Sequence, residues 1–284
     1  MASHGSQSLN TTDAVLWMPL LRVAEKIRDH QVPPGHVAIW WLGQNSFVLK
    51  DSSALIMVDP FFSRPGRAER YIHAEAPLRG DELSPDAVFC THSHWDHTDP
   101  PFLSELAEHS PTTRFFGPPE SGQEMVKAGI NGDRVIGLQA GQTVELGAAT
   151  AEVVFSKTRQ VSDVTHYGYI FTMGDGVRVY NTGDMMRGAT GEPDLMQPLR
   201  QAAPQVALIT MSPTEEEFPD FEEAARLAQE IGASVAIPSH YHCFADRTFD
   251  PKGFAAMLRD GEAVQPAIIE HCGVYLHPPA PANR

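Results

Sequence analysis

The stretch Thr91-His92-Ser93-His94-Trp95-Asp96-His97 decides how this sequence folds, because it brings three imidazoles and one carboxylate close together along the chain. It follows the apolar segment 87–91, which is predicted to be a buried strand. Residues two apart on an extended chain face the same side, so His92 and His94 can converge on one cation. The chain then turns into a predicted helix, which directs Asp96 and His97 toward a second position. The spacing therefore predicts two pairs of metal ligands, and the alternative is a polar surface loop.

The donor atoms narrow the choice of metal. Neutral imidazole suits zinc, manganese or iron, and an added carboxylate broadens the choice toward harder ions such as manganese. We therefore expect the cofactor to be a divalent metal, Mn²⁺ or Zn²⁺, bound as one or two ions.

Charge and cysteine content argue against several classes of protein. The chain of 284 residues carries 21 Lys and Arg against 36 Asp and Glu, which gives a net charge of −15. That balance repels phosphate backbones and anionic membranes, so we expect neither a nucleic-acid nor a membrane partner. The three cysteines are odd in number and far apart, which favours a reducing compartment and predicts a cytoplasmic location. No segment has the pattern of a signal peptide or a membrane helix.

The order of the predicted elements indicates one domain. Residues 1–12 are small and polar and are expected to form a flexible leader, followed by a single domain over 13–284. No repeat and no linker divides the chain. Two strand-rich halves each carry helices, so we expect an α/β fold with four layers in the order α/β/β/α. Strands are expected at 37–42, 46–50, 55–58, 87–91, 113–116, 206–210, 234–238 and 267–276 and near Val135, Val144, Val153, Tyr169 and Val179, and helices at 13–30, 102–109, 119–128, 195–201, 221–231 and 251–259.

The pattern H-x-H-x-D-H, formed by His92, His94, Asp96 and His97, resembles the signature of the metallo-β-lactamase fold. The resemblance implies the four-layer architecture and the activity of a metal-dependent hydrolase. It also implies that further ligands follow later in the chain.

Three later residues match that expectation. Asp184 ends the apolar segment 179–184, where the family presents a carboxylate that bridges both metals, and His240 follows the apolar segment 235–239, where the family places its last ligand. His166 lies near the position of one more histidine ligand, but closer to the following strand than is usual. Two readings of His166 stay open, a metal ligand or a group that supports a ligand or faces the substrate. If His166 is not a ligand, the first metal has fewer protein ligands, and only one ion is bound tightly.

Within the metallo-β-lactamase superfamily the chain looks most similar to the L-ascorbate-6-phosphate lactonase group. The resemblance implies hydrolysis of a lactone or related ester of a small, phosphorylated, carbohydrate-like molecule, and it allows a homo-oligomer because the related lactonases associate. The chain departs from the group by being shorter at its C-terminus and around 65–83, and by the pair Tyr241-His242 after the last ligand. The similar segments, in the same order, are 32–35, 38–43, 92–97, 116–118, 135–146, 180–184 and 237–240.

Hydrolysis in such a site needs an activated water molecule. A bound metal lowers the pKa of water from about 16 to near 7, so that hydroxide forms at neutral pH. We expect Asp184 to hold the ions and Asp96 also to accept a proton from the water. His242 is expected to stabilise the developing oxyanion or to protonate the leaving alkoxide, unless it is a solvated loop residue. Asp59, at the end of a predicted strand, is expected to orient the histidine loop, unless it only forms a turn.

A phosphorylated small-molecule substrate needs cationic groups in a protein that is acidic overall. Arginine offers the bidentate geometry that phosphate prefers. Four residues in predicted loops are the candidates for substrate binding, although each also fits a solvated surface charge: Arg64, Lys157, Arg159 and Arg247.

Two other functions remain open. A metal site of this type also cleaves phosphodiesters, in nucleases and in enzymes acting on cyclic phosphodiesters. The negative charge and the lack of a basic stripe disfavour a nuclease, but a small phosphodiester escapes that objection. The other alternative is a metal-binding scaffold without turnover, which the irregular position of His166 would explain.

Overall fold

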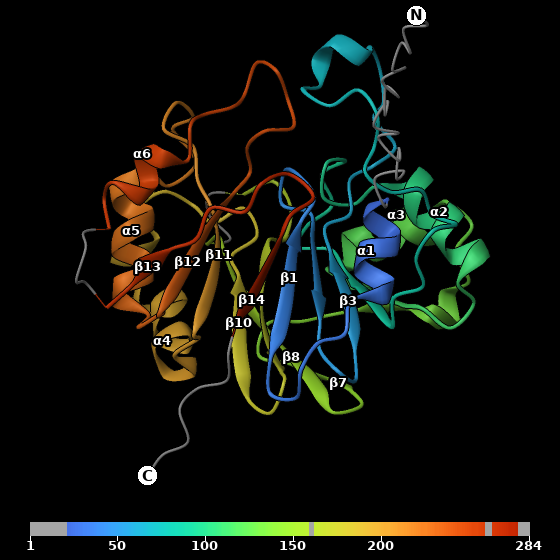
Figure 1. Ribbon diagram of the computed structural model, residues 1–284, viewed down its shortest axis with the longest axis horizontal. Helices are drawn as coiled ribbons and strands as arrows, with labels where there is room; N and C mark the ends of the chain where they lie inside the picture. The colour runs from blue at the N-terminus through green and yellow to red at the C-terminus, as the bar shows by residue number, and fades with distance from the viewer. Residues whose placement is uncertain (1–21, 159–161, 259–262, 278–284) are drawn as a thin grey trace, which may run out of the picture.

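Two mixed sheets packed face to face form the centre of the protein, and helices cover their outer faces. The structure is a computed structural model that describes residues 22–158, 162–258 and 263–277. In Figure 1 the helices α1 to α3 lie on one flank of the paired sheets and α4 to α6 lie on the other. The predicted four-layer α/β/β/α fold is confirmed. No helix in the described ranges is long and apolar enough to cross a membrane.

Among the residues that the structure describes, the first sheet contains seven strands and is built mainly from the N-terminal half. The last described strand returns to this sheet and pairs antiparallel with β1 at its edge. In spatial order the strands are β14 (Val274–His277), β1 (Val37–Trp41), β2 (Phe47–Lys50), β3 (Leu55–Val58), β4 (Ala87–Phe89), β5 (Arg114–Gly117) and β6 (Val135–Gly137).

The second sheet also contains seven strands and faces the first. Its antiparallel part, β7 to β10, is a meander, and its remaining strands run parallel to β10. In spatial order the strands are β13 (Gln265–Pro266), β12 (Val235–Ser239), β11 (Val206–Thr210), β10 (Val177–Asn181), β9 (Tyr167–Met173), β8 (Ala149–Phe155) and β7 (Thr143–Leu146).

The helices begin where sequence signals place them. For example, Asp99 caps α2 by accepting a hydrogen bond from the amide of Phe102, and Pro100 occupies the first turn, where a missing N–H costs nothing. The helices are α1 (Val23–Asp29), α2 (Pro100–His109), α3 (Pro119–Lys127), α4 (Pro193–Ala202), α5 (Phe221–Glu230) and α6 (Lys252–Ala255), with short 3₁₀ turns η1 (Ala68–Arg70), η2 (Gly132–Arg134) and η3 (Ala189–Gly191).

Strand β1 shows why the central strands are apolar on both faces. Val37, Ile39 and Trp41 pack into the core between the sheets. The alternate residues Ala38 and Trp40 pack into the core beneath α1, α2 and α3. Because successive strand residues point to opposite faces, a strand covered on both sides has no polar face. A third core lies between the second sheet and the helices α4 to α6.

The parallel strands of both sheets end at one edge of the sandwich. Strands β3 to β6 are parallel to one another, and so are β10 to β13. Loops that follow their carboxyl ends therefore gather together, which is where open α/β sheets place ligands. The loops after β3, β4, β10 and β12 carry Asp59, the 92–97 stretch, Asp184 and His240.

Two predicted elements differ from the structure. The predicted strand 267–276 is wrong, because the chain leaves β13 in the second sheet after Pro266 and reaches β14 in the first sheet only at Val274. Apolar composition could not reveal this crossing between sheets. The predicted helix 13–30 is described only from residue 22 onward, where α1 begins at Val23, and the leader 1–12 lies outside the described residues.

Candidate metal centre

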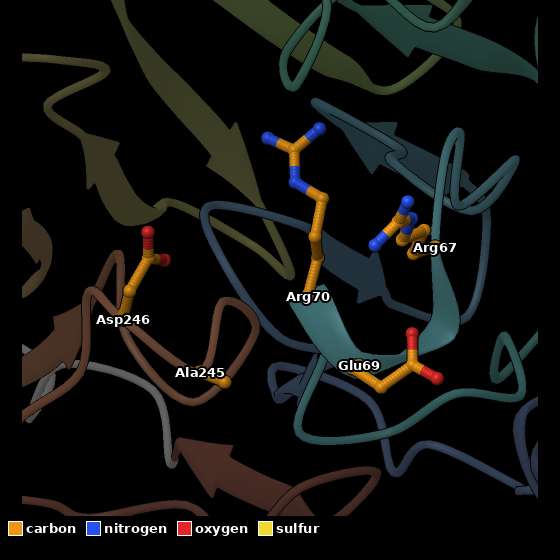
Figure 2. Close-up of a pocket in the computed structure, with 5 residues that line it drawn as sticks. All are labelled: Arg67, Glu69, Arg70, Ala245 and Asp246. Carbon is orange, nitrogen blue, oxygen red and sulfur yellow. The ribbon is translucent and has the colours of Figure 1, made fainter.

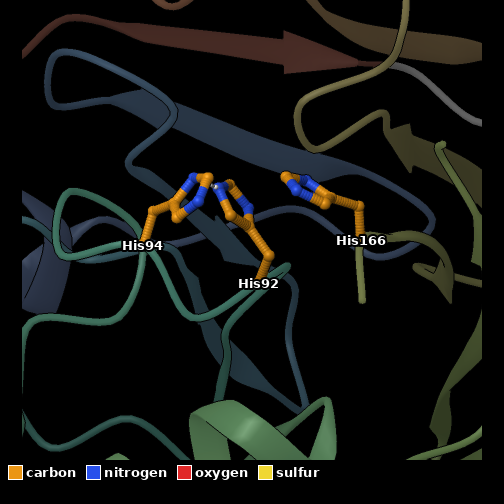
Figure 3. Close-up of side chains that lie close together, drawn as sticks. All are labelled: His92, His94 and His166. Carbon is orange, nitrogen blue, oxygen red and sulfur yellow. Dashed lines mark hydrogen bonds between the residues drawn. The ribbon is translucent and has the colours of Figure 1, made fainter. Parts of the chain in front are cut away.

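Three histidines converge at the end of β4 and the start of β9. Nε2 of His92 lies 3.0 Å from Nδ1 of His94. The ring of His166 is stacked on His92 with its centroid 4.0 Å away. The nitrogens of these three side chains lie within 4.8 Å of one another, and Figure 3 shows the rings turned toward a common space. We call His92, His94 and His166 the first ligand group.

Two histidines of this group are neutral near pH 7, which favours cation binding. Burial, followed by the charges of His97 and His166, holds the pKa of His92 well below its ordinary value. Burial and then the charge of Lys157 lower the pKa of His166 to about 3. Both imidazoles are therefore neutral near pH 7 and offer lone pairs to a metal. Neither ring nitrogen of His166 has a hydrogen-bond partner within the described part of the chain.

A second ligand group consists of Asp96, His97 and His240. Its members come from the loop after β4 and from the end of β12. Nε2 of His97 is buried and lacks a hydrogen-bond partner among the described residues. His240 adopts a positive φ of 70°, and its side chain lies with the other two, their ligand atoms all within 4.8 Å of one another.

Asp184 joins the two groups. Its Oδ1 lies 3.3 Å from Nε2 of His97 and 3.4 Å from Nε2 of His240, and its Oδ2 lies 3.6 Å from Nε2 of His92. Burial alone would raise the pKa of Asp184, but His97 and His240 act against it and lower the pKa to about 2. The carboxylate is therefore charged and presents one oxygen toward each ligand group.

These donors fit the expected cofactor. Buried nitrogens of His97 and His166 and one oxygen of Asp184 lack hydrogen-bond partners within the described ranges, although buried polar atoms are normally paired. Imidazole and carboxylate together suit Zn²⁺ or Mn²⁺. The structure therefore brings together all seven side chains that the sequence suggested as metal ligands: His92, His94, Asp96, His97, His166, Asp184 and His240.

Asp59 lies behind His97 at the end of β3. Its Oδ2 is 2.7 Å from Nδ1 of His97 and accepts hydrogen bonds from Nδ2 of Asn45 and Oγ1 of Thr91. Its Oδ1 accepts from the amide of Thr91. A carboxylate that accepts a hydrogen bond from Nδ1–H leaves Nε2 to face a metal. The geometry is that of a group that orients His97, and Asn45 is a partner that sequence reasoning missed.

Asp163 contacts His94 in a similar way. Its Oδ2 lies 3.3 Å from Nε2 of His94, whose Nδ1 faces the first ligand group. The segment is held from the other side, because Oγ1 of Thr165 donates to Oε1 of Glu120 in α3. The hydrogen bond from His94 is the main cause that lowers the pKa of Asp163, so this carboxylate is charged. The sequence offers only a carboxylate three residues before His166 as a signal.

The candidate substrate-binding residues occupy different surroundings. Lys157 is 7% exposed, and its Nζ lies 3.3 Å from Oε2 of Glu217. Arg64 donates to the carbonyl of Phe61, and Arg247 pairs with Glu215 at 3.7 Å. Of the three candidates within the described ranges, Lys157 alone is nearly buried. Arg159 lies outside the described residues.

His242 stands apart from both ligand groups. Its ring meets those of His73, with centroids 4.9 Å apart, and His271, with centroids 6.1 Å apart. Trp41, which belongs to the core between the sheets, has its ring centroid 6.3 Å from that of His242. Its expected role in protonating the leaving group stays a prediction.

A cavity of about 590 Å³ lies between η1 and the loop after β12. Figure 2 shows Arg67 and Arg70 on one wall and Asp246 on the other. The guanidinium of Arg70 lies 5.3 Å from the centre of the Trp95 ring, and Trp95 stands between the ligands His94 and Asp96 in the chain. Arg70 thus connects the cavity to the loop that carries His94 and Asp96, and sequence reasoning missed both arginines.

Comparison with known proteins agrees with this geometry. Residues 55–241 match the family profile described as the beta-lactamase superfamily domain. The chain is 29% identical over 238 residues to a UPF0173 metal-dependent hydrolase of Aeropyrum pernix, covering 78% of this chain and 88% of the relative. A second UPF0173 metal-dependent hydrolase, from Symbiobacterium thermophilum, is 24% identical over 84% of this chain and 98% of its own length.

Solved structures show the same fold. Igni18, a metallo hydrolase from Ignicoccus hospitalis, has a TM-score of 0.65 at 20% identity and covers 85% of this chain and 98% of its own. An isothiocyanate hydrolase from Delia radicum gut bacteria has a TM-score of 0.67 at 14% identity, covering 84% and 98%. At these identities the likeness concerns the fold alone. None of these names refers to a lactonase, so the closer resemblance to the L-ascorbate-6-phosphate lactonase group stays a prediction.

Proposed function

This chain belongs to the beta-lactamase superfamily domain family as a metal-dependent hydrolase, and we propose that it opens a lactone or ester of a small, phosphorylated, carbohydrate-like molecule. The observation that carries this proposal is a nearly buried cation beside the ligand groups. Lys157 is 7% exposed, and its charge acts on both His166 and Asp184. The ammonium pairs with Oε2 of Glu217, whose side chain is 62% exposed, and a substrate that brings its own negative charge can replace this exposed partner.

Each residue of the site has its own role in the proposed hydrolysis. The two ligand groups would hold the divalent metal, which supplies charge that polarises the attacked carbonyl and promotes the ionisation of water. Asp96, which is 9% exposed, accepts the proton of the attacking water in this scheme. Asp59 keeps His97 in the tautomer that presents Nε2. His242 donates the proton to the leaving alkoxide only if the substrate extends toward His73 and His271.

Two arginines of the cavity offer a further contact for an anionic substrate. Arg70 keeps its guanidinium over Trp95, and neither Arg67 nor Arg70 forms an ion pair with another described side chain. Glu69 and Asp246 also line the cavity, so its charges balance, and the two arginines would act by pairing directly with a phosphate group rather than through a net positive field. We propose that Lys157 and these arginines bind opposite ends of the substrate.

A small phosphodiester is the second candidate substrate. Asp184 directs one oxygen toward each ligand group, and two cations held by these groups would also supply charge for in-line displacement at phosphorus. The cytoplasmic location and a homo-oligomeric state remain predictions.

The test compares substrate classes on one preparation. The protein is stripped of metal, reloaded separately with Mn²⁺ and Zn²⁺, and assayed on phosphosugar lactones, neutral lactones and bis-nitrophenyl phosphate. We expect the phosphosugar lactones to be opened and the phosphodiester to be left mostly intact. The reverse preference supports a phosphodiesterase, and metal uptake with neither activity supports a scaffold. His94→Ala should remove metal uptake at the first ligand group together with turnover.

A further inference from the structure

The side chain of Gln44 occupies the second ligand group. Gln44 is 2% exposed, and its Nε2 lies 2.9 Å from Oδ2 of Asp96 and 2.9 Å from Nε2 of His240. The same oxygen of Asp96 faces Nε2 of His97 at 3.9 Å. The amide nitrogen therefore lies against the atoms that would bind a metal in this group.

The orientation of the amide follows from its neighbours. A carboxylate only accepts hydrogen bonds, so Oδ2 of Asp96 requires an N–H on its side. If the amide were turned over, its oxygen would face that carboxylate without a proton between them. In the observed orientation one N–H of Gln44 points to Asp96, and the other points to the lone pair on Nε2 of His240.

A cation and this amide compete for the same lone pairs. A metal binds carboxylate oxygen and imidazole nitrogen at about 2.0 to 2.2 Å through the lone pairs that here receive hydrogens from Gln44. The amide nitrogen cannot become a ligand instead, because it carries two hydrogens and offers no acceptor site. A cation can therefore enter the second ligand group fully only after the side chain of Gln44 rotates away.

Backbone hydrogen bonds hold Gln44 beside His240 and Tyr241. Its carbonyl accepts hydrogen bonds from Nε1 of Trp41 and from the amide of His240, both at 2.9 Å, and its own amide donates to the carbonyl of Tyr241. Its φ is 51°, in the left-handed region that non-glycine residues rarely adopt. The position next to His240 is therefore built into the fold, and only the side chain is free to leave.

Among the residues that the structure describes, the first ligand group has no competing side chain from outside the group. Its internal hydrogen bond, between Nε2 of His92 and Nδ1 of His94 at 3.0 Å, can be released by moving a ring proton, without displacing a neighbouring side chain. Within the described residues, His92, His94 and His166 contact one another, Asp163, Asp184, His97 and Thr91, and no side-chain amide reaches them. We propose that Gln44 controls metal occupancy, so that a first cation binds tightly at His92, His94 and His166 and a second binds only when Gln44 is displaced. The inference rests on metal binding by the proposed centre and does not depend on the substrate.

Metal stoichiometry tests the proposal. Metal-stripped protein is dialysed to equilibrium against a series of Zn²⁺ or Mn²⁺ concentrations, and bound metal per chain is measured by elemental analysis. We expect the wild-type protein to bind its second equivalent at least about tenfold more weakly than its first. Gln44→Asn tolerates a positive φ and is too short to reach both partners, so it should tighten the second equivalent by about tenfold and leave the first unchanged. Gln44→Glu exchanges the two donors for a carboxylate and should act in the same direction.

Two controls make the outcome specific. Gln142→Asn makes the same chemical change at a turn where its Oε1 accepts from the amide of Gln139, and it should leave both equivalents unchanged. His240→Ala should remove the second equivalent in the wild-type and Gln44→Asn proteins alike, with folding checked by circular dichroism. Two equivalents of equal affinity in the wild-type protein, or an unchanged second equivalent in folded Gln44→Asn, would overturn the proposal. Because the readout is bound metal, a failure of the lactone assay leaves this result intact.

Discussion

Nδ1 of His97 lies 2.7 Å from Oδ2 of Asp59, and both side chains are fully buried. Asp59 ends β3 and His97 belongs to the loop after β4, so the contact ties together the ends of two parallel strands. Burial by itself would lower the pKa of His97, but Asp184, Asp59 and Asp96 raise it to about 10. In the metal-free protein this imidazole is therefore protonated near neutral pH, and a metal must replace the proton on Nε2.

Replacing Asp59 should weaken metal binding. Asp59→Asn places an amide where one carboxylate accepts from His97, Asn45 and Thr91, so the orientation of His97 is lost. Partners of this kind are worth about 10- to 100-fold in metal affinity, and we expect a loss in that range, measured by competition with a chelator. Asp86→Asn is the matched control, because Asp86 accepts from the amide of Leu55 at the opposite end of β3. Equal losses in both variants would contradict the role of Asp59.

Asp163 should act on the first ligand group alone. Asp163→Ala removes the acceptor that lies 3.3 Å from Nε2 of His94, so Nδ1 of that ring is no longer favoured as the free nitrogen. We expect about tenfold weaker binding of the first cation, followed by the visible spectrum during a Co²⁺ titration. Asp133→Ala, at an exposed turn in η2, should leave the titration unchanged. An Asp163→Ala titration that superimposes on the wild type would refute this prediction.

Lys157 should affect charged substrates more than neutral ones. Lys157→Met keeps the aliphatic packing near Phe218, whose ring centre is 5.4 Å from Nζ, but removes the charge. For a phosphosugar lactone we expect KM to rise by about tenfold or more, equivalent to the loss of a charged hydrogen bond, with little change for a neutral lactone. Lys127→Met removes an exposed lysine of α3 and serves as the control. A similar change in KM for both substrates would show that Lys157 does not recognise the anion.

Acid should destabilise the protein in part through His271. Burial, followed by the charges of His73 and His242, lowers the pKa of His271 to about 4. Between about pH 6.5, the ordinary value for histidine, and about pH 4, the unfolded chain binds a proton at this residue that the folded chain does not. Stability is therefore lost as pH falls through this window.

Thermal unfolding across that window checks the prediction. His271→Gln should show a smaller fall in Tm than the wild type as the pH is lowered, whatever its Tm at neutral pH. His109→Gln, at an exposed position in α2, should keep the wild-type dependence. A fall in Tm of the same size in His271→Gln would mean that this histidine makes no contribution.

Sequence reasoning found the side chains that the structure gathers into the two ligand groups because their signal is local. The 92–97 stretch lies within a single turn after one strand, and Asp184 and His240 each follow an apolar strand of their own. The partners Gln44 and Asp163 escaped because each lies far along the chain from the residue that it contacts. Gln44 is 52 residues from Asp96 and 196 from His240, and its segment predicts only a turn.

The sequence by itself determined the layered fold and the kind of chemistry, because burial on both faces demands apolar strands and a metal demands imidazole and carboxylate at short spacing. Only the tertiary structure decided which of these side chains lie together, since that depends on how the ends of β4, β10 and β12 meet across two sheets. It also decided which groups compete for those ligands. Hydrogen bonds between distant segments form only when the strands are in register, and no local pattern in the chain records them.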